Sequence, residues 1–310
     1  MAEIPFLFAG YFFIHFLKKK IMVTVLQKEK AERFLKYHHD KELLVLLNTW
    51  DNGSSRLVEA CGYKAVATTS MGIAAALGYP DCEIIQLSEM LDVVSAIVKS
   101  VTVPVTVDIE AGYGNTTEEV VESVRKFIET GIVGINIEDS LNLSPNLIDE
   151  SEMCERITAI RKLSESLGFH LVINARTDSF YTGTGTIQEK MKASIRRGNL
   201  YKEAGADCIF VQPVSDKESI KTLVKEIHSP INILANPSIG SGFPPSVREL
   251  EDMGVARLSL GSSLMKATLA LMKKVADELS SHGTYKILSE TMSPGEETTL
   301  AYKMAVGTYR

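Results

Sequence analysis

The fold can be predicted from the segment Pro104-Val-Thr-Val-Asp-Ile-Glu110 and the residues that follow it. Residues two apart in a strand share a face, so its valines and isoleucine form one face, and Thr106, Asp108 and Glu110 form the other. We expect the apolar face to meet helices and the polar face to meet a barrel axis. The pattern over 117–130 then predicts an amphipathic helix that a glycine ends, and a second strand, Gly134–Asp139, follows. A strand, a helix and another strand in this order predict parallel pairing.

The same unit repeats along the chain. The predicted strands are Leu43–Asp51, Ala65–Ser70, Pro104–Glu110, Gly134–Asp139, His170–Asp178, Cys208–Pro213, Ile231–Pro237 and Arg257–Gly261. Eight strands that alternate with helices predict a closed (β/α)8 TIM barrel, an α/β fold. We assign the barrel to residues 23–283, an N-terminal appendage to 1–22, and a C-terminal helical tail to 284–310.

Composition excludes several classes of protein. The 310 residues are 45% hydrophobic and 23% charged, which is typical of a folded globular chain rather than a disordered one. The net charge is −6, and the sequence lacks the extended basic patch that binding to a phosphate backbone needs, so nucleic acid is not an expected partner. Four widely spaced cysteines without a C-x-x-C pair indicate reduced thiols and a cytoplasmic location.

The N-terminal segment is unusual because residues 5–17 are apolar and a basic run, Lys18-Lys-Lys20, follows them. A membrane-spanning helix needs about 20 apolar residues, and a signal peptide carries its basic residues before the apolar ones. We therefore expect a terminal appendage and no membrane partner. A helix that docks on the domain or on a partner, and a membrane contact, are the alternatives.

Acidic side chains occur late in several predicted strands, at the end where barrel enzymes build their sites. Asp51, Asp108, Glu110 and Glu138 share the inward parity. Two carboxylates about 6 Å apart repel by roughly 3 kcal/mol at an effective dielectric near 20. A cation would relieve this repulsion, and oxygen ligands that retain water suit Mg²⁺, with Mn²⁺ as a possible substitute. The alternative is that these are ordinary surface acids.

Several motifs occur in a fixed order: Asn48-Thr-Trp-Asp51, Thr69-Ser-Met-Gly72, Asp108-Ile-Glu-Ala-Gly-Tyr-Gly114, Gly134-Ile-Asn-Ile-Glu-Asp139, Asn174-Ala-Arg-Thr-Asp178 and Leu234-Ala-Asn-Pro-Ser-Ile-Gly240. Together they resemble the isocitrate lyase/phosphoenolpyruvate mutase superfamily, in its phosphonomutase-like branch, over residues 30–265. The resemblance implies a Mg²⁺-dependent enzyme that acts on a small 2-oxo acid or related carboxylate through an enolate-like species, with C–C or P–C bond cleavage or formation.

The resemblance also implies a role for each matching residue. Asp108 matches the direct metal ligand, and Asp51, Glu110 and Glu138 match acids that hold the metal mostly through water. Ser70, Met71 and Gly72 match the turn that receives the substrate carboxylate, and Asn236 matches a polar contact with the substrate from strand seven. Apart from the resemblance, we expect Trp50 to form part of the substrate-binding wall and part of the core. Arg176 and Asp51 are the candidate catalytic residues. Arg176 would neutralise the substrate's charge, so Arg176→Lys should weaken oxalate binding and leave thermal stability nearly unchanged.

One segment departs from the family pattern. The lyases carry a Lys-Lys-Cys-Gly-His or Lys-Arg-Cys-Gly-His run in the loop after strand four, whereas Ser140–Glu150 contains no Cys, Lys or His. Cys154 lies just beyond, in a helix that we expect Ser151 to cap. Isocitrate and methylisocitrate cleavage are therefore disfavoured, and a lyase, mutase or hydrolase of another specificity is expected.

Two alternatives to this enzyme stay open. One is a non-catalytic paralogue that binds the ligand for sensing or assembly. The other is a phosphate-binding barrel enzyme such as an aldolase, although no Schiff-base lysine lies late in a strand. We also expect a homo-oligomer, with a tetramer favoured, because the family exchanges or packs its C-terminal helices between subunits.

Overall fold

The computed structural model describes residues 23–140, 146–181, 185–236 and 244–291. Its strands are all parallel and follow the order β1-β9-β8-β7-β6-β5-β4-β3-β2. They are β1 (Leu44–Leu46), β2 (Asn48–Thr49), β3 (Val66–Thr68), β4 (Val105–Asp108), β5 (Gly134–Glu138), β6 (Val172–Thr177), β7 (Cys208–Val211), β8 (Ile231–Leu234) and β9 (Arg257–Ser259).

The first barrel strand consists of two segments. β1 pairs with β9, and β2 pairs with β3, so the chain from Leu44 to Thr49 joins the two ends of the sheet. Each of the eight predicted strands contains an observed strand, with β1 and β2 sharing the first. The predicted (β/α)8 TIM barrel is therefore confirmed.

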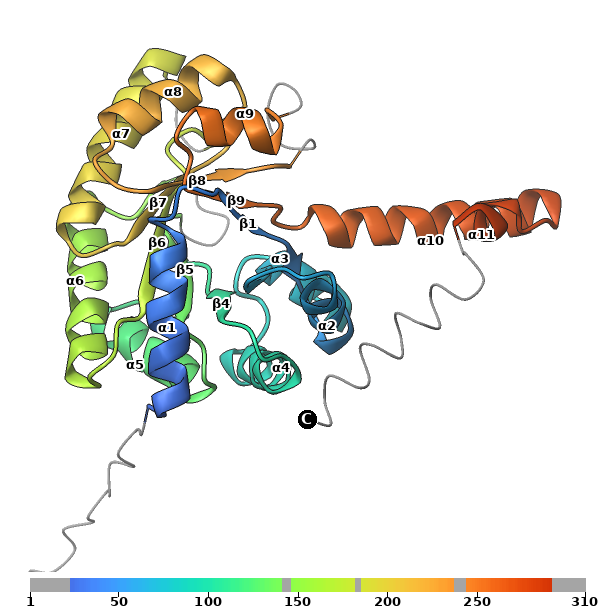
Figure 1. The fold of residues 1–310 in the computed structure, drawn as a ribbon, viewed down its shortest axis with the longest axis horizontal. Coiled ribbons are helices and arrows are strands. Elements are labelled where there is room, and N and C mark those ends of the chain that lie inside the picture. The colour runs from blue at the N-terminus through green and yellow to red at the C-terminus, as the bar shows by residue number, and fades with distance from the viewer. Residues whose placement is uncertain (1–22, 141–145, 182–184, 237–243, 292–310) are drawn as a thin grey trace, which may run out of the picture.

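Helices follow the strands (Figure 1). They are α1 (Val25–Tyr37), α2 (Asn52–Ala60), α3 (Ser70–Leu77), α4 (Leu87–Ser100), α5 (Thr117–Glu129), α6 (Glu150–Ser166), α7 (Ile187–Glu203), α8 (Lys217–Glu226), α9 (Val247–Asp252), α10 (Ser263–His282) and α11 (Lys286–Thr291). Among the described residues, no helix is long and apolar enough to cross a membrane.

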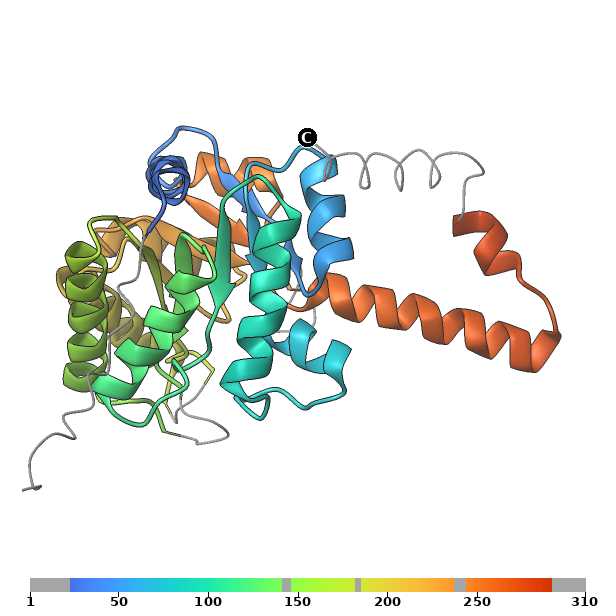
Figure 2. The same cartoon turned by 90° about the horizontal axis from the view of Figure 1, so that it is seen from below.

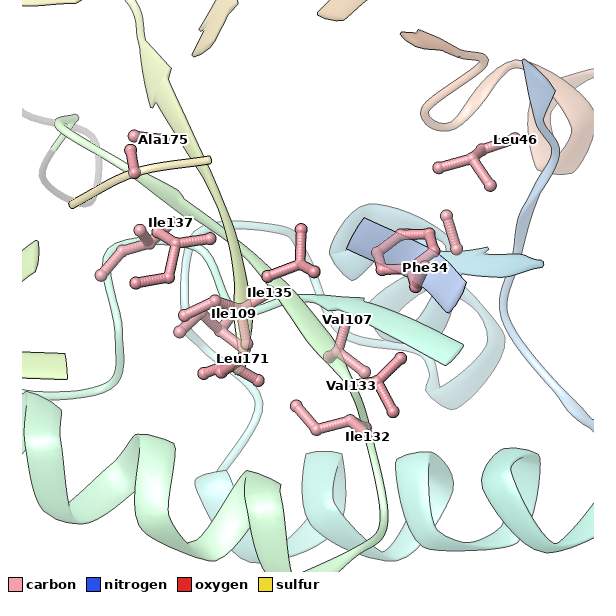
Figure 3. Close-up of a cluster of buried hydrophobic side chains, with 14 of the residues drawn as sticks. Phe34, Leu46, Val107, Ile109, Ile132, Val133, Ile135, Ile137, Leu171 and Ala175 are labelled. Carbon is pink, nitrogen blue, oxygen red and sulfur yellow. The ribbon is translucent and has the colours of Figure 1, made fainter. Parts of the chain in front are cut away.

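The sheet alternates as the sequence predicts. In the register of β4 with β5, Val107 is opposite Ile135 and Asp108 is opposite Asn136. Val107, Ile109, Ile135 and Ile137 are fully or almost fully buried in one apolar cluster (Figure 3). Burial of such side chains contributes about 1.5–3 kcal/mol each. The apolar face fixes the register, and the polar residues between are therefore directed to the other face.

Helix α1 closes the start of the barrel. The ring of Phe34 lies close to Gly134, where an added Cβ would stand only 2.8 Å from a ring carbon and 2.9 Å from the Thr106 hydroxyl. Gln27 anchors the same helix by donating to the carbonyls of Ile128 and Ile132. Glycine at the start of β5 is therefore a packing requirement.

Helix α10 differs from the other helices. It extends away from the barrel in both views (Figures 1 and 2), and Met265 is its one buried residue. Leu269, Leu271, Met272 and Leu279 are exposed along it. Helix α11 lies within the predicted tail 284–310, while residues 292–310 and the predicted appendage 1–22 lie outside the described residues.

Candidate active site

Asp108, the last residue of β4, is held by the start of α3. Its Oδ2 accepts hydrogen bonds from the Ser70 hydroxyl at 2.9 Å and from the Ser70 N–H at 3.3 Å. Its own N–H donates to the Thr68 hydroxyl at 3.1 Å. Thr69 caps α3 with its side chain, so the first N–H groups of the helix are directed toward the carboxyl ends of the strands. Two predicted site residues, Ser70 and Asp108, are thus in direct contact.

Glu110 lies two residues after Asp108 and is buried. Its Oε2 accepts from the N–H of Glu83 at 2.7 Å, and its Oε1 accepts from the Tyr113 hydroxyl at 3.2 Å. Burial, followed by the negative charges of Asp108 and Asp81, raises the pKa of Glu110 to about 8. Burial and the charge of Asp108 also raise the pKa of Asp81. These three acids therefore act on one another.

Glu138, the last residue of β5, pairs with Arg176 of β6. Arg176 binds Glu138 through one terminal nitrogen at 2.5 Å and binds Asp178 through two nitrogens, each at 2.7 Å. Burial raises the pKa of Glu138 well above its usual range, although Arg176 opposes the shift. Burial lowers the pKa of Arg176, but the charges of Glu138 and Asp178 outweigh it and raise the value. The arginine is therefore already neutralised by two carboxylates.

A second group of buried polar residues, centred on Asp139, lies next to Glu138 in the sequence and contacts Asp178, the partner of Arg176. Asp139 accepts from Arg197 at 3.0 Å, from the Tyr201 hydroxyl at 2.7 Å and from the N–H of Asp178 at 2.9 Å. The N–H of Ile148 donates to the Asp139 carbonyl at 2.7 Å, and the Ile148 carbonyl accepts from Arg197 at 3.0 Å. Both ends of the segment between Asp139 and Ile148 are therefore fixed, while its residues 141–145 lie outside the described part.

Cys154 belongs to the following helix, as predicted, but the predicted cap is wrong. Asp149 caps α6 and accepts from both the N–H and the hydroxyl of Ser151. A carboxylate accepts these bonds more strongly than a hydroxyl would, and Ser151 can donate to it. Burial, followed by the charge of Glu150, raises the pKa of the Cys154 thiol, which favours an unreactive side chain.

The other predicted site residues lie in different environments. Asp51 is exposed and caps α2, where its carboxylate accepts from the N–H and hydroxyl of Ser54 at 2.7 and 2.8 Å. Trp50 is half-buried against the core and close to Gly72, whose missing Cβ would stand 3.2 Å from that of Trp50. Met71 is half-buried in α3, and Asn236 is buried after β8. The structure therefore does not bring Asp51 into contact with the other acids.

Sequence reasoning missed Asp81, Glu83, Tyr113, Ser140 and Asp178 as site residues. The hydroxyl of Ser140 donates to both Glu138 and Asp178 at 2.7 Å. The sequence carries a signal for two of them, because Asp178 shares the parity of Arg176 and Ser140 directly follows the predicted strand Gly134–Asp139. Asp81 and Glu83 lie in a loop after α3, and their position depends on contacts between loops.

We define the acidic cluster as Asp81, Asp108, Glu110 and Glu138. Within the described ranges, no three His, Cys, Asp or Glu side chains form a ready-made metal cage. The donor chemistry nevertheless fits a hard divalent cation, because all four side chains are carboxylates, and burial together with the charge of Asp108 raises the pKa values of Asp81, Glu110 and Glu138. Oδ1 of Asp81 is buried and has no hydrogen-bond partner among the described residues. A cation that binds some of these carboxylates through water needs no group of three side chains in direct contact with it, so the carboxylates can hold it at their present spacing.

Comparison with known proteins identifies the family of the chain. The family model described as phosphoenolpyruvate phosphomutase matches residues 34–280. The 2-methylisocitrate lyase of Bacillus subtilis is 27% identical over 270 residues, which cover 84% of this chain and 85% of that protein. The 2,3-dimethylmalate lyase of Eubacterium barkeri is 30% identical over 224 residues, or 69% of this chain and 73% of that one.

A solved structure from Burkholderia cenocepacia, provisionally described as a lyase/mutase, extends the comparison to three dimensions. It superimposes with a TM-score of 0.81 at 29% identity and covers 90% of this chain and 97% of its own. The match spans the barrel that carries the acidic cluster. The chain therefore belongs to the phosphoenolpyruvate phosphomutase family, within the isocitrate lyase/phosphoenolpyruvate mutase superfamily.

Proposed function

We propose that this protein is a Mg²⁺-dependent enzyme that acts on a small 2-oxo acid or related carboxylate through an enolate-like species. The bond that it makes or breaks is a C–C or P–C bond. The observation that carries the proposal is the acidic cluster, which meets Arg176 and the N-terminus of α3 at the carboxyl ends of the strands. Members of the family that act on small carboxylates give the substrate class.

The chain's own residues supply binding and charge compensation. The hydroxyl and N–H of Ser70, at the start of α3, can donate to a substrate carboxylate if they release Asp108. Arg176 can hold a carboxylate in two parallel hydrogen bonds if it exchanges a contact with Glu138 or Asp178. A divalent cation held by Asp108, Glu110, Glu138 and Asp81 would supply Lewis-acid stabilisation of developing negative charge.

The loop after β5 bears on the reaction type. Residues 140–150 carry no Cys, Lys or His that could exchange a proton with substrate. We infer that isocitrate and methylisocitrate cleavage are not its reactions, even though a relative bears the latter name at 27% identity. A phosphonate or 2-oxo acid lyase, mutase or hydrolase is the better fit. The same bare loop favours the second candidate function, a non-catalytic paralogue that retains ligand binding.

A metal titration tests the first part of the proposal. Calorimetry should give one Mg²⁺ site per chain, and Asp108→Ala should abolish binding and turnover. Asp51→Ala is the matched control, because this exposed cap should leave Mg²⁺ affinity intact and cost about 0.5–2 kcal/mol of stability. Equal Mg²⁺ affinity in the wild type and Asp108→Ala would contradict the proposed site.

A substrate screen tests the second part. Oxaloacetate, phosphonopyruvate and methylisocitrate should be incubated with the Mg²⁺-loaded protein, and we expect turnover of one of the first two. Turnover of methylisocitrate would contradict the inference from the loop. Tight oxalate binding without turnover of any compound would favour the non-catalytic paralogue.

We also propose that the protein is a cytoplasmic homo-oligomer, with a tetramer favoured. Helix α10 supports the assembly, because its exposed leucines and Met272 need a partner surface. The four free cysteines support a reducing compartment.

A further inference from the structure

Four residues other than glycine have a positive φ in the described part of the chain. They are Cys82 (79°), Glu83 (53°), Glu110 (53°) and Tyr113 (56°). Side chains with a Cβ disfavour this left-handed conformation, and glycine adopts it freely. Such residues persist only where surrounding contacts impose the conformation, and they gather at functional sites. All four lie in two loops, one after α3 and the other after β4.

Hydrogen bonds join the two loops reciprocally. The N–H of Glu83 donates to the Glu110 carboxylate at 2.7 Å, and the N–H of Tyr113 donates to the Glu83 carboxylate at 2.9 Å. The Tyr113 hydroxyl adds a bond to Glu110 at 3.2 Å. Bonds from N–H groups to carboxylates are among the stronger hydrogen bonds in proteins. We call this arrangement the loop clamp.

The loop clamp lies next to the acidic cluster. Asp81 is two residues before Glu83, and Asp108 is two residues before Glu110. Asp81 reaches the cluster from a loop rather than from a strand end, so nothing in the sheet fixes its position. Its buried Oδ1, without a partner in the described residues, is left available to a ligand. The loop clamp is therefore a contact that fixes this loop against the residues that follow β4.

We propose that Glu83 is a positioning residue for the cation site. Its carboxylate and N–H hold residues 81–83 against residues 110–113 and thereby keep Asp81 beside Asp108. A glycine at position 83 would adopt the positive φ without strain. We take the glutamate there as a sign that its carboxylate, which accepts from the N–H of Tyr113, offsets the strain. This inference rests on the proposed function, because it requires that a divalent cation binds the acidic cluster.

The test is a Mn²⁺ titration of the full chain by calorimetry, with Mn²⁺ as the probe. Glu83→Ala and Glu83→Gly should weaken binding about 10–100-fold, the usual effect of losing a residue that orients metal ligands. Glu83→Gln should bind close to the wild type, because its amide oxygen can still accept from Tyr113. Glu118→Ala, an exposed glutamate in the first turn of α5, is the matched control and should not change affinity.

The melting temperature of the metal-free variants separates positioning from simple structural support. Unchanged Mn²⁺ affinity in Glu83→Ala and Glu83→Gly would overturn the inference, whether or not their melting temperatures fall. If both variants fail to fold, Glu83→Asp decides, because it keeps the charge but is one methylene too short for Tyr113. Wild-type affinity in Glu83→Asp would then overturn the inference. Absence of Mn²⁺ binding in the wild type would overturn the proposed function itself.

Discussion

Replacement of Arg176 by lysine separates a structural role of this residue from a substrate-binding role. Arg176 is 19% exposed in its side chain and makes three contacts with carboxylates, two to Asp178 and one to Glu138. Lysine presents one point charge on a flexible stem and cannot reproduce a planar fork. It can keep one of the three contacts.

The magnitude follows from the lost contacts. Each hydrogen bond to a charged group contributes about 1.5–3 kcal/mol, so losing two of them costs about 3–6 kcal/mol. Relaxation of the lysine offsets part of this cost, which leaves about 3 kcal/mol. For a domain of this size, about 2–4 °C of melting temperature corresponds to each kcal/mol. We therefore expect the melting temperature to fall by roughly 6–12 °C. This differs from the sequence-based expectation of unchanged stability, because that expectation did not include the pairing with Asp178.

Two assays on the same protein complete the experiment. Circular dichroism gives the melting temperature, and calorimetry gives the affinity for oxalate, which should fall at least about tenfold. Arg161→Lys is the matched control. Arg161 also makes several contacts, to Asp207, Gly205 and Leu171, but these lie at the opposite end of the strands. It should lower the melting temperature and leave oxalate affinity intact.

Each measurement can refute one part of the reasoning. An unchanged melting temperature in Arg176→Lys would show that the paired carboxylates do not depend on the guanidinium. A lower melting temperature with unchanged oxalate affinity would restrict Arg176 to neutralising the acids.

Three further predictions concern other parts of the molecule. Gly134→Ala should lower the free energy of unfolding in urea by about 1–3 kcal/mol, because the new methyl would overlap Phe34. The control Gly53→Ala in α2 should not lower it, and equal stability of the two variants would contradict the packing argument. Because the pKa of Glu110 is raised in the folded state, the free energy of unfolding of the metal-free protein should fall as pH rises from about 4.5 to about 8. Glu110→Gln should make the free energy of unfolding less dependent on pH over this range, and an unchanged pH dependence would refute the raised pKa of Glu110. Met272→Glu in α10 should shift the mass from light scattering toward that of one chain, and an unchanged oligomer would exclude this part of α10 from the interface.

The barrel could be predicted because its signals are local. Eight apolar runs, glycines after helices and a period of two in each strand appear directly in the sequence, and all eight strands occur where expected. The inward parity of Asp108 and Glu138 was also sufficient to place them near Arg176. Regular backbone determines where such side chains point.

The errors and omissions occur where regular backbone ends. The predicted inward direction of Asp51 requires that the first strand continues to this residue, but the strand ends at Thr49. The following residues favour a helix cap, which binds the Asp51 carboxylate to Ser54. Asp81 enters the site through a loop held by Glu83 and Glu110, and a contact between two loops has no period in the sequence. Such residues require coordinates.

The anchoring of the segment after β5 has a consequence for chimeras that exchange its sequence. Its two ends meet at the Asp139–Ile148 hydrogen bond and at the bridge between Ser140 and Leu147, and Arg197 and Tyr201 secure them from α7. Substitutions between these ends therefore leave the anchoring contacts in place. A chimera that exchanges only the residues between the two ends therefore keeps the four residues that hold the segment to the barrel, Asp139, Ile148, Arg197 and Tyr201.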